Sequence, residues 1–410
     1  LLGRVPRWLR AVVAGMLNVY AQHHLGRLLA STGPRSADSY WQLTDRTASY
    51  RQWFWRELDR HADRPVDAVL LPPHALPALK YGTSLDLLGA ASYCYLPNLL
   101  GNPAGVVPWR TIRGEECSGY WPAGTAAFHF NADIADAVRR YVMITGDREF
   151  EEHYGCELLV ETARLWESLG HHDDYGAFRI DGVTGPDEYS ALVDNNVYTN
   201  LMAQRNLESA YHCTGRHPSV ARRLGVDDDE RERWRAAAEA MFIPFDEQAG
   251  VHPQDDSFLH HQPWDFASTP DENYPLLLHY PYFQLYRQQV IKQADLVLAM
   301  HVRGDAFTLE QKRANFDYYE PLCVRDSSLS AATQAVVAAE VGHLDLAKDY
   351  LYEASHMDIA DLERNTGDGL HMASLAGAVI ATVSGFGGLR DHGGRLEFRP
   401  RLPEGLERLR

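Results

Sequence analysis

The sequence predicts an all-α protein in which many helices share one core, and three observations support this. Eight amphipathic segments follow one another between residues 131 and 386, with apolar residues three and four positions apart. Glycine, proline and aspartate breakers separate these segments, and few strand-like stretches lie between them. Eight or more helices in one core favour a toroid over a bundle.

The helices can be placed in chain order from their apolar spacing. The first, residues 131–147, has an apolar face made of Ile134, Val138, Tyr141 and Val142. The second, residues 157–170, has one made of Leu158, Leu159, Ala163 and Trp166. The same pattern recurs in residues 195–213, 230–242, 284–300, 329–342, 344–356 and 369–386. The acidic run at 227–229 is expected to be a solvated helix start.

The two ends of the chain differ from this helical part. Residues 1–105 have weak periodicity and many prolines, so they are predicted as an N-terminal region and linker without an assigned fold. Residues 389–410 begin with a glycine-rich break, after which Leu396 and Phe398 alternate as in a β-strand. The predicted domains are therefore 1–105, a helical domain at 106–388, and the start of a β-domain at 389–410.

Composition limits the partners. The 410 residues carry 39 Lys and Arg against 56 Asp and Glu, a net charge of −17, and 45% of them are apolar. This is a globular composition whose charge argues against nucleic acid or an anionic membrane surface as a partner. No apolar run is long enough to cross a membrane.

The cysteines predict reduced thiols and a cytoplasmic location. There are five, they lie far apart, and no CxxC pair occurs: Cys94, Cys117, Cys156, Cys213 and Cys323. This spacing favours free thiols over a disulfide framework, and no Cys/His cluster or HExxH motif indicates a metal site.

The densest group of loop-borne polar residues lies at 181–200. Gly185 and Pro186 form a stiff turn that presents Asp187 and Glu188. A carboxylic acid held there among aromatic residues can stay protonated until it donates to a leaving oxygen, which makes Glu188 a candidate catalytic acid. The alternative is a turn whose acids only cap the next helix.

Three further segments are candidate binding sites. The loop entering the helix at 372 offers backbone N–H groups, with Gly369, His371 and Ser374 as candidate phosphate contacts; the alternative is an ordinary tight turn. Lys292 and Gln293, inside a predicted apolar helix, either point into a site or extend to the surface.

The third segment, residues 106–131, mixes aromatic residues with carboxylates and arginine. Trp109 and Glu116 are its candidate sugar contacts, because aromatic plates beside carboxylates suit a pyranose ring. An aromatic-rich core loop is the alternative.

Several segments together resemble glycoside hydrolase family 65. The similar motifs, in chain order, are VPWRTIRGEECSGYWPAGTAAFHFN, GVTGPDEY, DNNVYTN, VIKQADLVLAM, YYEPLCVRDSSLS, NTGDGLHMASLAGA and GFGGLRDHGGRLEFRPRLP, over about residues 106–405. The family contains inverting phosphorylases of α-linked glucose disaccharides such as trehalose, maltose and kojibiose, and some hydrolases. The first motif is most similar to trehalose and trehalose-6-phosphate phosphorylases.

The resemblance implies an (α/α)6-barrel catalytic domain with remnants of flanking β-domains, a chain truncated on its N-terminal side, and a tendency to form homodimers. Glu188 matches the family's general acid, and Lys292 with Gln293 matches its sugar-contacting pair. The Gly369–His371 loop matches the region near the phosphate.

The implied reaction is phosphorolysis of a disaccharide such as trehalose, maltose or kojibiose to β-glucose 1-phosphate and a sugar. Inorganic phosphate is then a co-substrate and no cofactor is expected. An inverting hydrolase is the first alternative, since a second carboxylate can activate water in place of phosphate. The second is an inactive sugar-binding remnant, because the Trp-Asp pair with which the family grips the non-reducing glucose is not recognisable in its usual context.

Overall fold

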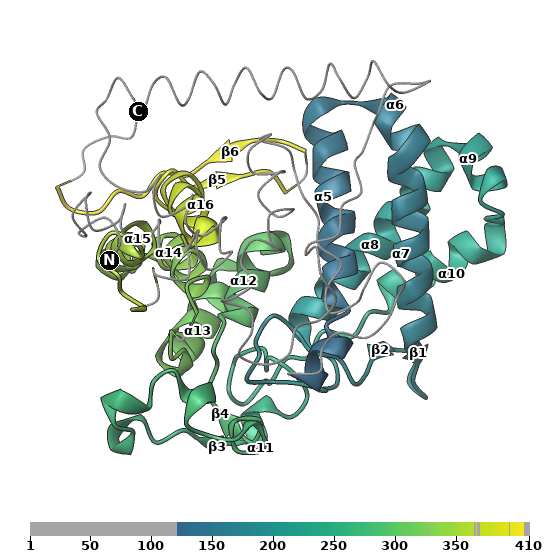
Figure 1. Ribbon diagram of the computed structural model, residues 1–410. Helices are drawn as coiled ribbons and strands as arrows, with labels where there is room; N and C mark the ends of the chain where they lie inside the picture. The colour runs from purple at the N-terminus through teal and green to yellow at the C-terminus, as the bar shows by residue number, and fades with distance from the viewer. Residues whose placement is uncertain (1–120, 326, 365, 367–369, 393, 406–410) are drawn as a thin grey trace, which may run out of the picture. The chain divides into compact units, whose positions relative to one another are not determined.

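The computed structural model describes residues 121–325, 327–364, 366, 370–392 and 394–405, and they are mainly helical (Figure 1). The longer helices are α5 (His129–Thr145), α7 (Cys156–Leu169), α8 (Val197–Arg216), α10 (Asp228–Glu239), α12 (Asp295–Val302), α13 (Leu309–Tyr319), α14 (Ser330–Val341), α15 (Leu344–His356) and α16 (Met372–Ile380). The shorter ones are α6 (Arg148–Phe150), α9 (Pro218–Arg223) and α11 (Tyr282–Leu285). This confirms the all-α prediction, although the described residues do not show a complete (α/α)6 barrel.

Strands are few and short in this part of the chain. β1 (Gly170–His172) pairs antiparallel with β2 (Phe178–Ile180), and β3 (Gln262–Pro263) pairs parallel with β4 (Gln288–Gln289). β5 (Leu389–Arg390) pairs antiparallel with β6 (Glu397–Phe398), which confirms the strand expected near Phe398.

Local side chains explain where several helices begin and end. Asn196 precedes α8, and its side chain accepts a hydrogen bond from the backbone N–H of Thr199. Asp227 precedes α10, and its side chain accepts from the backbone N–H of Glu230. The acids that follow Asp227 lie at the positive end of the helix dipole, as the sequence predicted. Gly146 ends α5 at φ +69° and Gly342 ends α14 at φ +102°, a conformation that favours glycine.

Two groups of helices pack around one main core (Figure 1). Helix α8 lies against α5, α7 and α10, while α14 packs on α15, α16 and α12. A helix α8–α12 contact joins the groups. The predicted faces are confirmed at Val138, Leu159 and Trp166, which are buried, but Tyr141 and Leu158 are 44% and 43% exposed. Part of the buried face of α5 is instead formed by its own small alanines, which indicate a buried helix face less clearly in the sequence than large apolar residues do.

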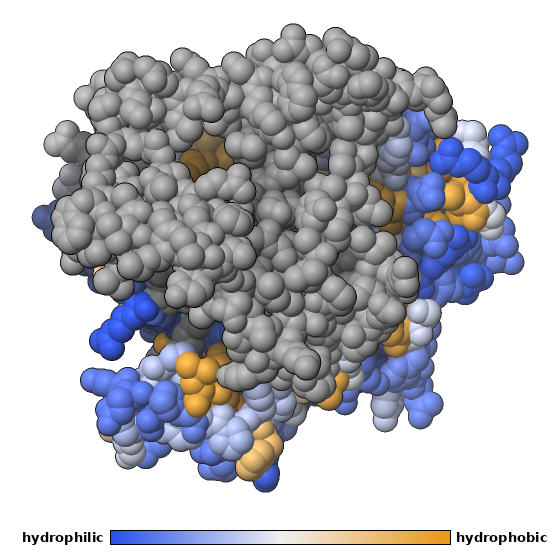
Figure 2. Space-filling model, in the orientation of Figure 1, coloured by the Kyte–Doolittle hydropathy of each residue, from blue (hydrophilic) through white to orange (hydrophobic). Residues whose placement is uncertain are grey.

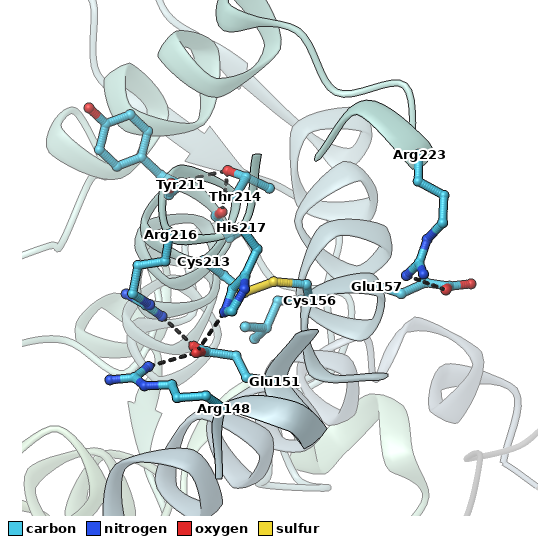
Figure 3. Close-up of a disulfide and its surroundings, with 12 residues drawn as sticks. Arg148, Glu151, Cys156, Glu157, Tyr211, Cys213, Thr214, Arg216, His217 and Arg223 are labelled. Carbon is cyan, nitrogen blue, oxygen red and sulfur yellow. Dashed lines mark hydrogen bonds and ion pairs between the residues drawn. A yellow bond between two sulfur atoms is a disulfide. The ribbon is translucent and has the colours of Figure 1, made fainter. Parts of the chain in front are cut away.

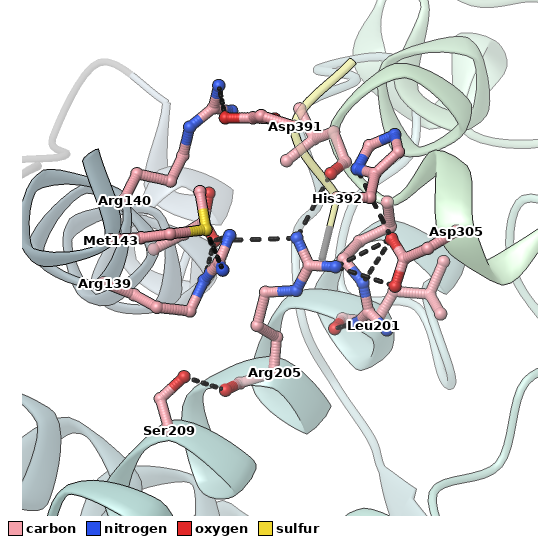
Figure 4. A network of polar contacts seen from close by, with 12 residues as sticks. Arg139, Arg140, Met143, Leu201, Arg205, Ser209, Asp305, Asp391 and His392 are labelled. Carbon is pink, nitrogen blue, oxygen red and sulfur yellow. Dashed lines mark hydrogen bonds and ion pairs between the residues drawn. The ribbon is translucent and has the colours of Figure 1, made fainter. Parts of the chain in front are cut away.

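A polar network also links distant elements (Figure 4). The Arg205 guanidinium on α8 donates to both oxygens of Asp305 at 2.7 and 2.8 Å and lies 3.7 Å from Asp136 on α5. Arg140 pairs with Asp391 at 2.9 Å, which ties α5 to the segment after β5.

The helix predicted at 284–300 is wrong in its middle. α11 ends at Leu285, and α12 begins only at Asp295. Between them, Ile291 exchanges backbone hydrogen bonds with Leu322 and Val324, both at 3.0 Å. This extended pairing satisfies the buried backbone and leaves Lys292 and Gln293 before the helix instead of inside it.

The prediction of reduced, separate cysteines is wrong for Cys156 and Cys213. Cys156 at the start of α7 and Cys213 near the end of α8 form a disulfide, with Cα atoms 5.9 Å apart (Figure 3). His217 joins them, so a Cys/His cluster exists after all. The 57-residue separation hides this proximity because it arises from the packing of two helices. The thiol argument therefore no longer supports a cytoplasmic location. Cys323 is free and buried.

Other predictions concern residues outside this part of the chain: the region 1–105, Cys94, Cys117, Trp109, Glu116 and Gly369. In the described residues, none of the helices combines the length and apolarity that a membrane span requires. The described residues visible in Figure 2 are mostly hydrophilic, with small apolar patches.

Candidate active site

The loop that carries Asp187 and Glu188 packs directly against two other segments. A Cβ added to Gly185 would lie 2.4 Å from Oδ2 of Asp295 and 2.5 Å from Nδ2 of Asn196. Glycine is therefore required here for close approach of the backbone to these side chains. Asn196 is the cap of α8 and Asp295 is the first residue of α12, so the loop is fixed to the ends of two helices.

Asp187 is fully buried and serves as an anchor. Its Oδ1 accepts from the backbone N–H groups of Lys292 at 2.8 Å and Tyr189 at 3.1 Å, and its Oδ2 accepts from Gln254 at 3.0 Å. Burial raises the pKa of Asp187 to about 6, although these donors oppose the shift. The carboxylate thus holds the 187–188 loop against residues 292–293.

Asp295 lies next to it and is also fully buried. Its Oδ2 accepts from Asn196 at 3.1 Å and from the backbone N–H of Asp187 at 3.3 Å. Burial, followed by the nearby charge of Asp187, raises the pKa of Asp295 well above its ordinary value. In the described part of the chain, its Oδ1 has no hydrogen-bond partner.

Glu188 differs from these two acids because it remains accessible. Its side chain is 33% exposed and forms an ion pair with Nζ of Lys292, whose side chain is 14% exposed. Its backbone N–H donates to Oε1 of Gln293 at 3.0 Å. The structure therefore brings together three residues that the sequence singled out, Glu188, Lys292 and Gln293.

Aromatic side chains lie beside this group. Nε1 of Trp121 donates to the hydroxyl of Tyr286 at 2.6 Å, and the Trp121 ring stacks on Tyr282 at 6.3 Å. Burial raises the pKa of Tyr286, and the charge of Glu188 adds to this shift, which places the hydroxyl within the field of the acid. Tyr286 and Gln254 were missed by sequence reasoning, since neither stands in a polar motif.

His371 and Ser374 occupy a different place. His371 precedes α16, and its Nδ1 and backbone N–H pair with the two oxygens of Asp358 at 2.6 and 2.9 Å. Ser374 is buried and donates to the carbonyl of Ala354 at 3.1 Å. Over the described residues, no hydrogen bond or ion pair joins either of them to Glu188. The nearest link is indirect: Ser330, at the start of α14, donates to the carbonyl of Lys292 at 3.3 Å, and α14 packs on α16.

The arrangement suits acid catalysis. Two buried acids fix the loop, and the accessible carboxyl of Glu188 is held by the Lys292 cation and acts electrostatically on the Tyr286 hydroxyl. A general acid needs this kind of positioning next to space that a substrate can enter. Among the described residues, the group of side chains with metal-ligand chemistry lies elsewhere, at Cys156, Cys213 and His217, where the two cysteines form a disulfide.

Comparison with known proteins gives a consistent family. The chain is 55% identical over 360 residues to an uncharacterised glycosyl hydrolase from Mycobacterium tuberculosis, covering 86% of this chain and 45% of that protein. It is 45% identical over 315 residues to an α,α-trehalose phosphorylase from Thermoanaerobacter brockii, covering 74% and 41%. The chain thus spans less than half the length of these relatives.

A solved structure agrees. A human-microbiome protein provisionally assigned as a kojibiose phosphorylase matches with a TM-score of 0.65 at 29% identity, covering 70% of this chain and 43% of that one. Residues 98–380 match the central catalytic domain of glycosyl hydrolase family 65. The accessible acid on its anchored loop therefore lies within this domain, and the chain belongs to glycosyl hydrolase family 65.

Proposed function

We propose that the chain carries the catalytic domain of an inverting phosphorylase that cleaves an α-linked glucose disaccharide. The observation that carries the proposal is the position of Glu188, an accessible acid paired with Lys292 on a loop anchored by Asp187. The phosphorylase names of several relatives, including those of trehalose and maltose, support the same reaction class.

In the proposed reaction, Glu188 donates a proton to the glycosidic oxygen as the bond to the anomeric carbon breaks. Phosphate attacks that carbon from the opposite face, so the products are β-glucose 1-phosphate and the released sugar. Phosphate is already anionic and needs no base to activate it. One protein carboxyl group is therefore sufficient, provided that phosphate is held in line.

The remaining residues have supporting roles in the proposal. Lys292 and Gln293 orient Glu188 and contact sugar hydroxyls, and Trp109 and Glu116 complete the sugar site. His371, with the Gly369 loop, holds phosphate, and Asp358 fixes its ring through Nδ1. Because the Ser374 hydroxyl already donates to Ala354, we assign it to shaping this loop.

A hydrolase is the second candidate, because the mycobacterial relatives are named as glycosyl hydrolases. The experiment is to incubate the purified chain with trehalose, trehalose 6-phosphate, maltose or kojibiose, with and without inorganic phosphate. Phosphate-dependent formation of β-glucose 1-phosphate, followed by ³¹P NMR, is the expected result. Glucose release without phosphate supports the hydrolase. Binding of a disaccharide without turnover supports a sugar-binding domain that has lost catalysis.

A further inference from the structure

The proposed reaction does not use the cluster at the junction of α7 and α8, where four chemically active side chains converge (Figure 3). The Cys156 and Cys213 sulfurs and a ring nitrogen of His217 all lie within 4.8 Å of one another. Glu151 adds a carboxylate, whose Oε2 lies 3.0 Å from Nε2 of His217. Both cysteines are fully buried, and the side chains of His217 and Glu151 are 13% and 2% exposed.

The backbone brings these side chains from two helices to one point, as in a metal site. Cys213 lies in the last turn of α8, and His217 follows the helix as its C-terminal cap, with its backbone N–H donating to the carbonyl of Cys213 at 3.0 Å. Cys156 faces them from the start of α7. When the two sulfurs are not bonded to each other, Zn–S distances of about 2.3 Å set them about 3.8 Å apart in a tetrahedral site. Small rotations of the two side chains supply this separation.

The hydrogen bond of His217 selects which ring nitrogen is available. Nε2 is engaged by Glu151, and in the described part of the chain Nδ1 makes no hydrogen bond. Histidines that bind metals through one nitrogen and a carboxylate through the other are a recurring arrangement in zinc sites. Glu151 is itself held by Arg148 and Arg216, so its role is to orient His217 while its own charge is balanced.

A cavity of about 270 Å³ reaches the cluster at Glu151, which lines it together with Arg148 and Arg216. The two cysteines and His217 are not among its lining residues. Ligand identity and an outer partner for the histidine are features expected of a metal site.

From this geometry we propose that the reduced form of the chain binds one Zn²⁺ through Cys156, Cys213 and His217, with solvent in the fourth position, and that the disulfide form does not. A dithiol reductant delivers two electrons and two protons to the Cys156–Cys213 bond and closes to its own disulfide. Zn²⁺ then replaces the two thiol protons, which pass to solvent, and forms two Zn–S bonds and one Zn–N bond. Exchange with an oxidised dithiol, which takes up the two electrons and two protons from solvent, re-forms the Cys156–Cys213 bond and releases the ion.

The test uses the full chain and Co²⁺, a spectroscopic substitute for Zn²⁺. The protein is reduced with dithiothreitol, separated from it without oxygen, and titrated with Co²⁺. The reduced chain is expected to show a thiolate-to-cobalt charge-transfer band and the intense visible bands of a tetrahedral ion. Zn²⁺ is expected to abolish both, and the oxidised chain is expected to show neither. Two protons released per Zn²⁺, measured with an indicator dye, identify two thiol ligands.

Variants separate this site from other thiols. Cys156→Ser is expected to lose the charge-transfer band. His217→Gln is expected to weaken Co²⁺ binding by more than the about 10- to 100-fold that loss of a residue hydrogen-bonded to a metal ligand costs. His212→Gln is the matched control, since His212 lies on the same helix next to Cys213 but outside the cluster, and it is expected to bind as the unmodified chain does. Circular dichroism confirms folding of each variant. No charge-transfer band in the reduced chain, or an unchanged affinity in His217→Gln, overturns the proposal.

Discussion

Glu188 and Asp187 are adjacent acids with opposite environments. Asp187 is fully buried and accepts hydrogen bonds from three backbone N–H groups and an amide, so its carboxylate cannot approach a substrate without dismantling the loop. The Glu188 side chain is 33% exposed and forms an ion pair with Lys292. The same turn thus supplies an anchor and, in the proposed reaction, the group that donates the proton.

Replacing Glu188 by Gln removes the proton without changing the size of the side chain. We expect turnover to fall by about 10²- to 10⁴-fold, since this is the usual contribution of a general acid. Steady-state kinetics on the substrate identified above measure the effect. Glu247→Gln, at an exposed loop position, is the control and should retain full activity. If Glu188→Gln turns over as fast as the control, another group is the acid.

Asp187 gives a pH dependence whose sign follows from its environment. Its folded pKa is about 6 against an ordinary value of 3.8, so between these values the folded chain keeps a proton that the unfolded chain has lost. The free energy of unfolding therefore falls as pH rises through this window, by about 3 kcal/mol from this group.

Urea unfolding from pH 3.5 to 7 measures this dependence. The Asp187→Asn variant is less stable throughout, because an amide whose oxygen stays on the backbone donors turns its NH2 group toward the NH2 group of Gln254, where two donors meet. Its stability should nevertheless vary less with pH over the same window. Glu247→Gln should keep the original dependence. Equal pH dependence in all three proteins contradicts the assignment.

At the scale of elements, the site depends on how two helices begin. Asn196 caps α8 through its oxygen and donates its amide N–H to Asp295, the first residue of α12. One side chain therefore completes a helix end and satisfies a buried acid. The 181–200 segment suggested the cap, because Asn before a helix is a strong local signal. The second bond is not visible in sequence, since 99 residues separate its partners.

Asn196→Ala should therefore lower the free energy of unfolding by more than the loss of a helix cap alone. Loss of the cap contributes about 1 kcal/mol, and leaving Asp295 without this donor adds about 1–3 kcal/mol. Asp227→Ala, at the cap of α10, is the matched control and should cost about 1 kcal/mol, because within the described residues its side chain accepts only from the backbone N–H of Glu230. Urea unfolding compares the two. Equal losses show that the bond to Asp295 adds nothing.

Helices whose signals lie within their own segment could be predicted from the sequence. A segment whose conformation depends on backbone pairing with a distant segment could not. Helix α8 follows from its Asn196 cap and its apolar spacing, and α14 from its spacing and the glycine that ends it. The segment around Lys292 also has helical spacing, yet it is extended because Ile291 pairs with the backbone of residues 322 and 324. The backbone pairing with a distant segment therefore outweighed the local helix propensity of this segment. Even so, Lys292 lies beside Glu188, since Asp187 binds the backbone of the extended segment.

At the scale of the whole molecule, long-range contacts are the part that sequence reasoning missed. Glu188, Lys292 and Gln293 could be named because they stand in motifs. Gln254, Tyr286 and the cysteine pair could not, since each owes its role to a residue more than 50 positions away. The spacing of residues along the chain does not predict contacts that form when distant helices pack together.

The Cys156–Cys213 bond gives the last prediction, because it closes a loop across two helices of the main core. A loop of this length, 57 residues, lowers the entropy of the unfolded chain enough to contribute about 4 kcal/mol. With EDTA present to exclude metal binding, reduction should therefore lower the free energy of unfolding, measured in urea, by about that amount.

Two variants serve as controls for this prediction. The double variant with Cys156→Ser and Cys213→Ser should show the lower stability with or without reductant. Cys323→Ser, which removes a free buried thiol, should retain the response to reductant. A stability that is indifferent to reductant in the unmodified chain is the contrary result, and it means that α7 and α8 are held by packing alone.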